Sequence, residues 1–489
     1  MFSINFFLIL IMVFPIFGIL LLLIIPAKQE KLLKVVALNS ACLSFIAALC
    51  MFGCFQNSVG YFQFVIKLSW FPISHINLIL GVDGISLFFV LLTTLLIPLC
   101  LLTSWNITTS LKKFLISFLL LDFFLIGTFC VLDVLLFYIF FESVLIPMYI
   151  IVGVWGSRDR KILAAYYLFL YTLFGSVIML ISIIYIYVQV GTTDYETLLT
   201  FSFSLLEQKF MWFAFFLAFA SKVPMLPVHL WLPEAHVEAP TGGSVILAGV
   251  LLKLGTYGFI RFSLPLFPKA SFFFTPLVYT VAVVGVIYTS FTAIRQTDFK
   301  RIIAYTSIAH MNLVILGIFS FNVIGLEGAI LQSLSHGFVA SALFLIIGVV
   351  YDRYRTRLVQ YYGGLATVMP LYAVVFVFFT MANISFPGTS SFVGEFLILV
   401  GVFKANSTIT FLGATGVIIG GAYSLWLLNR IMFGNLKTQY SRYFSDLSLR
   451  ECVLFFPLIL GTLGIGVYPS IFLNSIHVSV NYLVELLYF

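Results

Sequence analysis

The sequence has few charged residues for its length. Charged side chains make up 9% of the 489 residues, whereas hydrophobic side chains make up 62%. A soluble protein of this size could not cover its surface with so little charge. Apolar stretches, many of them near the roughly 20 residues that cross a bilayer, follow one another from end to end, and no polar segment is long enough to be a separate domain. The composition therefore excludes a soluble protein and predicts one polytopic membrane domain.

Cysteine and cofactor motifs are also scarce. None of the six cysteines falls in a C-x-x-C pair or in another spacing that suits zinc or an iron–sulfur cluster. No glycine-rich dinucleotide motif or phosphate-binding motif occurs. Haem b needs histidine pairs that face each other across helices, but His229 and His236 lie on one segment, and His310 and His336 have no second pair. We therefore expect no cofactor and no metal in this chain.

The basic residues predict how the chain is oriented. Their longest cluster, Arg158, Arg160 and Lys161, is too short to indicate a nucleic-acid partner despite the net charge of +7. Connections after odd-numbered spans hold 18 of the 25 Lys and Arg, connections after even-numbered spans hold five, and only Lys222 and Lys253 remain inside spans. The positive-inside rule puts the odd connections on the cytoplasmic or matrix side and both termini on the other side. The fourteen expected spans are residues 4–26, 34–53, 78–103, 114–131, 134–156, 164–190, 210–231, 243–260, 273–293, 302–320, 324–350, 366–403, 410–429 and 453–470.

Two of these spans are abnormal. The seventh carries Pro224 and Pro227 shortly after Lys222, and the twelfth, which is about 38 residues long, is interrupted at 385–391. Exposed backbone at membrane depth is tolerated only inside protein or beside a wet cavity. Because the breaks lie five spans apart, we predict an all-α polytopic fold with two inverted repeats of five helices. The predicted units are residues 1–110 (helices 1–3), 111–262 (first repeat, helices 4–8), 263–435 (second repeat, helices 9–13) and 436–489 (helix 14 and an amphipathic tail).

Ionisable side chains occur inside several expected spans, near mid-depth. Such groups are costly in a bilayer and by default mark an ion path. An acid beside a lysine allows a proton to be loaded and released as the partner's charge changes, and lysine can release a proton where arginine cannot. Asp83 and Asp122 are weaker candidates of this kind. We therefore predict a proton path, parallel to the membrane, through Glu142, Lys222, Lys253, His310, His336 and Glu395.

Each of these groups also has a structural interpretation. Glu142 and Lys222 could form a static ion pair that only fixes helix packing, and Lys253 could extend to an interface. The two histidines could be satisfied core residues, and Glu395 could cap the second half of its broken helix. Polar residues that follow the first break are expected to line an access channel, with contacts of an interfacial loop as the alternative: His229, Glu234, His236 and Glu238.

Two long motifs surround several of these groups. They are residues 137–156, FYIFFESVLIPMYIIVGVWG, and residues 220–244, ASKVPMLPVHLWLPEAHVEAPTGGS, which LLKLG follows at 251–255. These motifs resemble the chain 4 family of NADH–ubiquinone oxidoreductase (respiratory complex I), and the resemblance extends over residues 80–435. It implies that Glu142, Lys222, Lys253 and Glu395 match the family's charged positions, with His310 and His336 on its central polar axis. Sister subunits usually carry lysine where this sequence has Glu395, which favours chain 4.

The resemblance also implies a function. We expect an antiporter-like subunit that pumps protons, while other subunits oxidise NADH through FMN and iron–sulfur clusters and reduce ubiquinone. Its expected partners are other membrane-arm subunits, including neighbouring antiporter-like ones, and membrane lipids. The expected location is the mitochondrial inner membrane, with a bacterial plasma membrane as the alternative. Three other interpretations remain open: a stand-alone sodium/proton antiporter subunit, a chloroplast-type relative, and a scaffold whose buried charges only pack helices.

Overall fold

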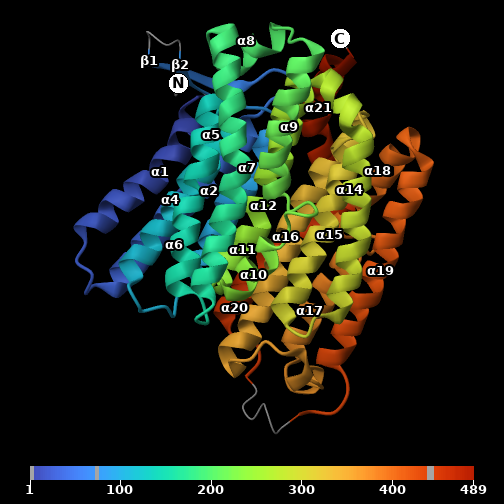
Figure 1. Ribbon diagram of the computed structural model, residues 1–489. Coiled ribbons are helices and arrows are strands. Elements are labelled where there is room, and N and C mark those ends of the chain that lie inside the picture. Colours follow the sequence, from blue (N-terminus) through green and yellow to red (C-terminus); the bar gives the residue numbers. More distant parts are fainter. Residues whose placement is uncertain (1–4, 72–75, 438–444, 489) are drawn as a thin grey trace.

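The computed structural model describes residues 5–71, 76–437 and 445–488, which form a bundle of long helices (Figure 1). Within these residues, thirteen helices are long and apolar enough to cross a membrane. They are α1 (Phe6–Ile24), α2 (Glu30–Cys54), α3 (Gly84–Thr103), α4 (Leu111–Cys130), α5 (Val134–Ser143) with α6 (Leu145–Trp155), α7 (Lys161–Val190), α11 (Thr241–Ile246) through α13 (Leu264–Leu266), α14 (Pro268–Arg295), α15 (Phe299–Ile318), α16 (Val323–Tyr354), α19 (Ser407–Met432), α20 (Leu449–Val467) and α21 (Ser470–Tyr488).

Two further passages are broken helices, as predicted. The first consists of α9 (Leu205–Lys222) and α10 (Trp231–Glu238), and the second consists of α17 (Pro370–Asn383) and α18 (Ser390–Ala405). The segments between the halves contain the prolines and glycine that the sequence places there.

The last passage is also made of two helices. Arg353, at the end of α16, donates to Glu451 in the first turn of α20, with an Nη2–Oε2 distance of 2.8 Å. At the other end, the Tyr488 hydroxyl of α21 donates to the backbone oxygen of Phe321, just before α16 begins. Because α16 crosses the bundle once, α20 and α21 together also cross it once. The described residues thus make fourteen passages, which confirms the predicted count.

One hairpin lies outside the helices, where the sequence predicts a connection and, from residue 78, the start of the third span, so the start of that span is wrong. Strands β1 (Gln63–Phe71) and β2 (Ile76–Val82) pair in antiparallel fashion, with Lys67 opposite Ile79, at the end of the bundle where both termini lie (Figure 1). The Leu132 amide donates to the Ile79 oxygen, 2.9 Å away, and so ties the hairpin to the start of α5. Outside the apolar spans, backbone groups are free to pair between segments, and the helical period that defines the spans does not predict such pairing.

The two broken passages run in opposite directions. α9 packs along α7, and α18 packs along α16. α9 starts at the end of the bundle that carries the termini, whereas α17 starts at the opposite end (Figure 1). The longer half of each broken passage thus packs on the helix before it, with the order of long and short halves reversed. The opposite directions of the two broken passages are what the predicted inverted repeat requires.

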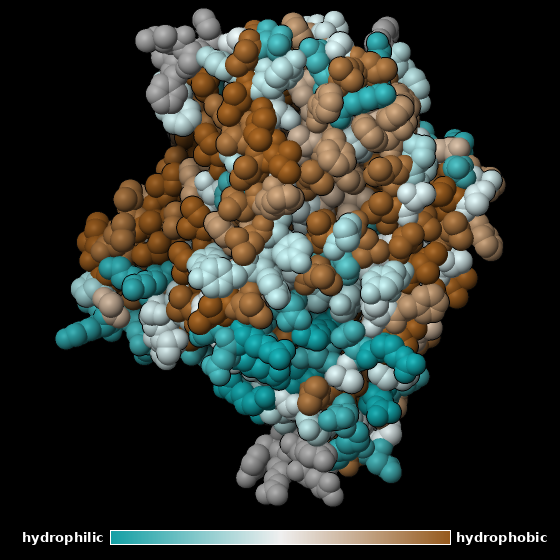
Figure 2. All heavy atoms as spheres, in the orientation of Figure 1, coloured by the Kyte–Doolittle hydropathy of each residue, from teal (hydrophilic) through white to brown (hydrophobic). Residues whose placement is uncertain are grey.

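Hydrophilic side chains gather at the lower end of the bundle, opposite the termini, and hydrophobic ones cover the flanks (Figure 2). Two basic residues that the sequence assigns to connections are instead buried within helices. Arg261 lies in the π-helical segment η3 (Phe259–Ser263), which prolongs a helix expected to end at residue 260. Lys300 lies in the first turn of α15, because the Asp298 side chain accepts from the Lys300 amide and starts that helix earlier than expected.

Candidate functional site

Glu142 and Lys222 face the same region from two interrupted helices. Glu142 lies in the last turn of α5, and Lys222, whose side chain is buried, is the last residue of α9. Lys222 Nζ donates to the Phe141 oxygen at 3.4 Å and lies 4.4 Å from the centroid of the Phe141 ring. No ion pair within 4.0 Å joins Glu142 to Lys222 among the described residues. The two groups interact through space, and Glu142 Oε1 has no hydrogen-bond partner.

The break after Lys222 is stabilised by hydrogen bonds within the protein. The Met225 amide donates to the Ala220 oxygen at 2.9 Å. The indole Nε1 of Trp231, the first residue of α10, donates to the Ser221 oxygen at 2.8 Å. These bonds replace helix bonds that the prolines cannot make, so the lysine is held at a fixed helix end inside the protein.

Lys253 and His336 are in direct contact. Lys253 lies in α12 (Leu252–Gly258), between η3 and a second π-helical segment, η2 (Leu247–Leu251), a local geometry that often marks functional sites. Lys253 Nζ donates to the Ala248 oxygen at 2.6 Å and lies 2.8 Å from His336 Nδ1 on α16. A charged lysine can only donate, so Nδ1 accepts and the imidazole proton lies on Nε2.

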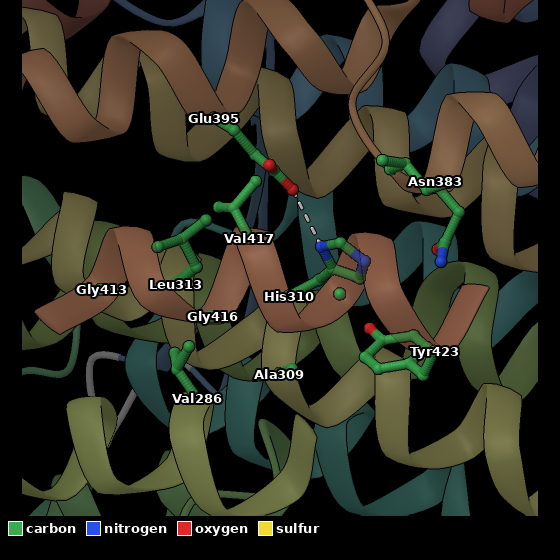
Figure 3. A pocket seen from close by; sticks show the side chains of 12 residues that line it. Val286, Ala309, His310, Leu313, Asn383, Glu395, Gly413, Gly416, Val417 and Tyr423 are labelled. Carbon is green, nitrogen blue, oxygen red and sulfur yellow. Dashed lines mark hydrogen bonds and ion pairs between the residues drawn. The ribbon is translucent and has the colours of Figure 1, made fainter. Parts of the chain in front are cut away.

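A second contact pairs His310 with Glu395. His310 Nδ1 on α15 lies 2.9 Å from Glu395 Oε1 on α18. Gln332 Nε2 donates to the same carboxylate oxygen at 2.9 Å. Figure 3 shows His310 and Glu395 pointing toward each other over a cavity, which has about 330 Å³ of empty space and which the Tyr423 side chain also lines. The first half of the broken passage α17–α18 ends beside this cavity.

The two contacts are separated by one gap. The rings of His310 and His336 have centroids 6.0 Å apart, and Nε2 of each ring lacks a hydrogen-bond partner. The four groups Lys253, His336, His310 and Glu395 therefore form one series, with two direct contacts and a single gap between the imidazoles. The structure brings these four predicted residues together and leaves Glu142 and Lys222 as a separate pair.

The predicted access-channel carboxylates lie in ion pairs. Glu234 Oε1 is 2.6 Å from Arg301 Nη2, with both side chains about one-third exposed. Glu238 Oε1 is 3.4 Å from Arg357 Nη2, and this arginine also lies 3.5 Å from Asp298 Oδ2. Arg357 is buried and also donates to the Val237 oxygen. These pairs tie α10 to the start of α15 and to the segment after α16.

The two histidines of the same segment differ from the carboxylates. His229 is buried, with its ring 6.2 Å from the Tyr288 ring. His236 is fully buried and stacks on Phe344 with centroids 4.5 Å apart. Neither ring nitrogen of His236 has a hydrogen-bond partner among the described residues. A buried imidazole in this condition is unusual and needs a reason.

Lys300 is a buried amine that the sequence does not single out. Its Nζ donates to the Ala239 oxygen at 2.7 Å and to Ser244 Oγ at 3.4 Å. The tenth span is expected to begin at residue 302, so the sequence assigns Lys300 to the connection before it. The usable signal is Asp298 two residues earlier, since aspartate is a common residue before the first helical turn.

A further buried pair lies toward the end of the bundle that carries the termini. Arg261 Nη2 is 2.6 Å from Asp83 Oδ2, and Arg261 Nε donates to the Tyr257 hydroxyl at 3.3 Å. Asp83 also caps α3 through a hydrogen bond from the Ser86 amide at 2.9 Å. Burial raises the pKa of Tyr195 in α8 (Tyr195–Thr200) to about 12, although the nearby Arg261 opposes this shift. The pair thus joins the start of α3 to η3, and the side chains of Tyr257 and Tyr195 lie beside it.

Comparisons with known proteins match nearly the whole chain. The model of the family described as "NADH:quinone oxidoreductase/Mrp antiporter, TM" matches residues 131–420. NADH-ubiquinone oxidoreductase chain 4 of Arabidopsis thaliana is 57% identical over 472 residues, which cover 96% of this chain and 95% of the relative. NADH-quinone oxidoreductase subunit M of Rhodobacter capsulatus is 47% identical, with 94% and 92% covered.

Two solved structures share the fold. A chain of respiratory complex I from Thermus thermophilus with bound NADH superposes with a TM-score of 0.89 at 30% identity, and the match covers 98% of this chain and 99% of that one. A chain of the Mrp complex from Dietzia sp. superposes with a TM-score of 0.85 at 20% identity, covering 99% and 98%. The second likeness concerns the fold alone.

Proposed function

The chain belongs to the NADH-ubiquinone oxidoreductase chain 4 family, and we propose that it translocates protons as a membrane-arm subunit of that enzyme. The series Lys253, His336, His310 and Glu395 is the observation that carries the proposal. Amines, imidazoles and carboxylates are the side chains that can pass a proton along such a series. Other subunits would hold FMN and the iron–sulfur clusters that oxidise NADH and reduce ubiquinone. Its partners are other membrane-arm subunits, including neighbouring antiporter-like ones.

The hydrogen bonds give the series a consistent polarity. Lys253 gives a proton to His336 Nδ1, and the imidazolium then loses the proton on Nε2. A water that bridges the gap carries a proton to His310 Nε2, and His310 releases its Nδ1 proton to Glu395. After one passage Lys253 is neutral, Glu395 is protonated, and each imidazole has changed tautomer. The starting state returns when each imidazole reverts to its first tautomer, Glu395 releases its proton and Lys253 takes up another.

Glu142 and Lys222 have a different part in this proposal. Because they interact through space and not by direct contact, a change in charge near Glu142 alters how firmly Lys222 holds its proton. The backbone oxygen and the ring of Phe141 keep the lysine in place while this happens. The pair thus couples the series to events outside the chain, and the carboxylate faces the partly exposed side of α5.

The location and the internal units are also proposals. We place this multi-pass protein in the mitochondrial inner membrane, supported by relatives named chain 4 in Arabidopsis thaliana, Marchantia polymorpha and Mycosarcoma maydis. The similarity to subunit M of Rhodobacter capsulatus keeps a bacterial plasma membrane as the alternative. We propose residues 111–262 and 263–435 as the two repeats, with residues 1–110 and 436–489 flanking them.

Co-purification followed by reconstitution tests the function. The tagged full chain is isolated, and the isolate is placed in proteoliposomes with and without sodium. We expect an NADH-oxidising assembly that quenches a proton-sensitive dye on addition of NADH and ubiquinone, whether or not sodium is present. A chain that purifies alone and exchanges sodium for protons would instead establish the stand-alone antiporter, which the likeness to an Mrp complex chain makes the second candidate.

A further inference from the structure

A large hollow opens at the end of the bundle opposite the termini. It has about 1060 Å³ of empty space and receives side chains from α3, α6, α15 and α16. The Thr241 hydroxyl, the Ser157 hydroxyl and the Asp352 carboxyl line it. Lys300 also lines it, although only 3% of this residue is exposed. The hollow therefore reaches one buried amine.

Lys300 is linked to the interior through polar atoms of one segment. Its Nζ donates to Ser244 Oγ at 3.4 Å, and Ser244 Oγ donates to the His236 backbone oxygen at 3.1 Å. The His236 ring is fully buried, has no hydrogen-bond partner at either nitrogen, and interacts through space with both Lys300 and Lys253. The His236 ring also interacts through space with His336. An unpartnered imidazole thus interacts through space with two buried amines.

We propose that Lys300 takes up the proton that the series uses, and that His236 carries it to Lys253. This inference rests on the proposed function and adds its uptake route. Protonated Lys300 gives a proton to one nitrogen of His236 through a bridging water and becomes a neutral amine. The imidazolium gives the proton on its other nitrogen to neutral Lys253, and water in the hollow protonates Lys300 again. No other reactant is consumed.

Charged groups of both signs surround Lys300. The charges of Asp298, Glu238 and the Arg357 guanidinium all act on Lys300 through space. Both carboxylates lie beside Arg357, which is buried and stays charged, so they are fixed counter-charges. Asp352 on α16 also faces Lys300 and lines the hollow. Lys300 is the one lysine among the described residues that line this hollow, and it is buried.

A purely structural role is the competing explanation. Ala239 follows the last residue of α10, and a lysine that donates to a carbonyl at a helix end stabilises that end. Lys161 offers a matched control, because its Nζ donates to the Val154 oxygen at 2.8 Å, near the end of α6, but it lies on the surface. Lys300→Arg and Lys161→Arg both keep a positive donor at a helix end.

The test is NADH-driven proton pumping by the intact complex in proteoliposomes, followed over a range of pH on the uptake side. Because arginine does not release its proton, Lys300→Arg is expected to slow pumping by about tenfold or more. Lys161→Arg is expected to pump at the unaltered rate. His236→Phe keeps the stack on Phe344 and makes no new demand on hydrogen bonds, and it is expected to slow pumping to a similar extent. Both slowed variants should also lose the pH dependence on the uptake side.

Unaltered pumping by Lys300→Arg, or by His236→Phe when Lys300→Arg does not assemble, would overturn the uptake route. Lys253→Arg is measured in parallel to separate this failure from that of the proposed function. If Lys253→Arg abolishes pumping and the other two variants pump normally, the uptake route is wrong and the series stands. If Lys253→Arg also pumps normally, the series itself is wrong.

Discussion

The two halves of the predicted proton path are built differently. In the second half, Lys253, His336, His310 and Glu395 lie in sequence, with contacts of 2.8 and 2.9 Å on either side of one imidazole gap. In the first half, Glu142 and Lys222 sit at the ends of interrupted helices, and Lys222 is held by a backbone oxygen and an aromatic ring. A proton can be transferred between groups in direct contact, whereas groups that interact only through space can respond to a change in a neighbouring charge.

The largest expected effect comes from the second half. Lys253→Arg keeps the positive charge but cannot release a proton, so we expect an assembled complex whose proton pumping is abolished. Dye quenching in proteoliposomes measures it. Lys209→Arg is the control, because Lys209 lies over the Phe273 ring at 3.5 Å and takes no part in the series. If Lys253→Arg pumped at the unaltered rate, Lys253 would be a fixed charge and the contrast between the halves would vanish.

A smaller loss is expected from the first half. Glu142→Gln removes the charge and keeps the shape, so assembly should survive while coupled NADH:ubiquinone reductase activity falls steeply, by about tenfold. Glu142→Asp keeps the charge with a shorter reach and should fall less. The rates of the two variants are compared after the amount of assembled complex has been equalised. Normal activity in assembled Glu142→Gln would remove Glu142 from the path.

Combining two changes in the first half separates coupling from packing. A structural ion pair predicts that Glu142→Gln with Lys222→Met restores function, because neither charge is left buried alone. Since the structure shows no direct pair between them, we expect the double variant to assemble at least as well as Lys222→Met alone but to remain as inactive as Glu142→Gln. Recovery of pumping in the double variant would identify a static pair and contradict the coupling role.

The smallest effect on pumping is expected away from both halves. Asp83→Asn retains a residue that caps α3 well but leaves the buried Arg261 guanidinium unpaired, at a cost of about 3–5 kcal/mol. We expect a lower melting temperature of the subunit within the complex and an unchanged number of protons pumped per electron. Asp194→Asn, which alters a helix cap at the same end, should change stability less. A changed proton-to-electron ratio in Asp83→Asn would extend the path beyond the two halves.

The sequence predicts the residues of both halves better than it predicts their contacts. Ionisable groups inside apolar spans are conspicuous, and prolines mark the breaks, so Glu142, Lys222 and Glu395 can be found without a structure. The contact of Lys253 with His336 joins positions 83 residues apart, and it depends on how α12 meets α16 and on the π-helical turns beside Lys253. No local pattern specifies either.

The residues that sequence reasoning missed lie at the ends of spans. Lys300 and Arg261 look like ordinary basic residues of connections, because each helix extends a few residues beyond the apolar stretch that predicts it. The hairpin of β1 and β2 was missed because its pairing joins separate segments, and the apolar residues of β2 were predicted as the start of the span at 78–103. The passage of α20 and α21 was predicted as one helix and a tail, and only the contacts at both ends of α16 identify it as one crossing.

The central claim is that a proton passes between Lys253 and Glu395 through the two imidazoles. His336→Gln tests it most directly, because the amide oxygen can still accept from Lys253 but a glutamine does not take up and release a proton. The measurement is the number of protons pumped per electron by the assembled complex in proteoliposomes. The account predicts that this ratio falls while Lys253 stays bonded and the complex stays intact. An unchanged ratio would contradict it.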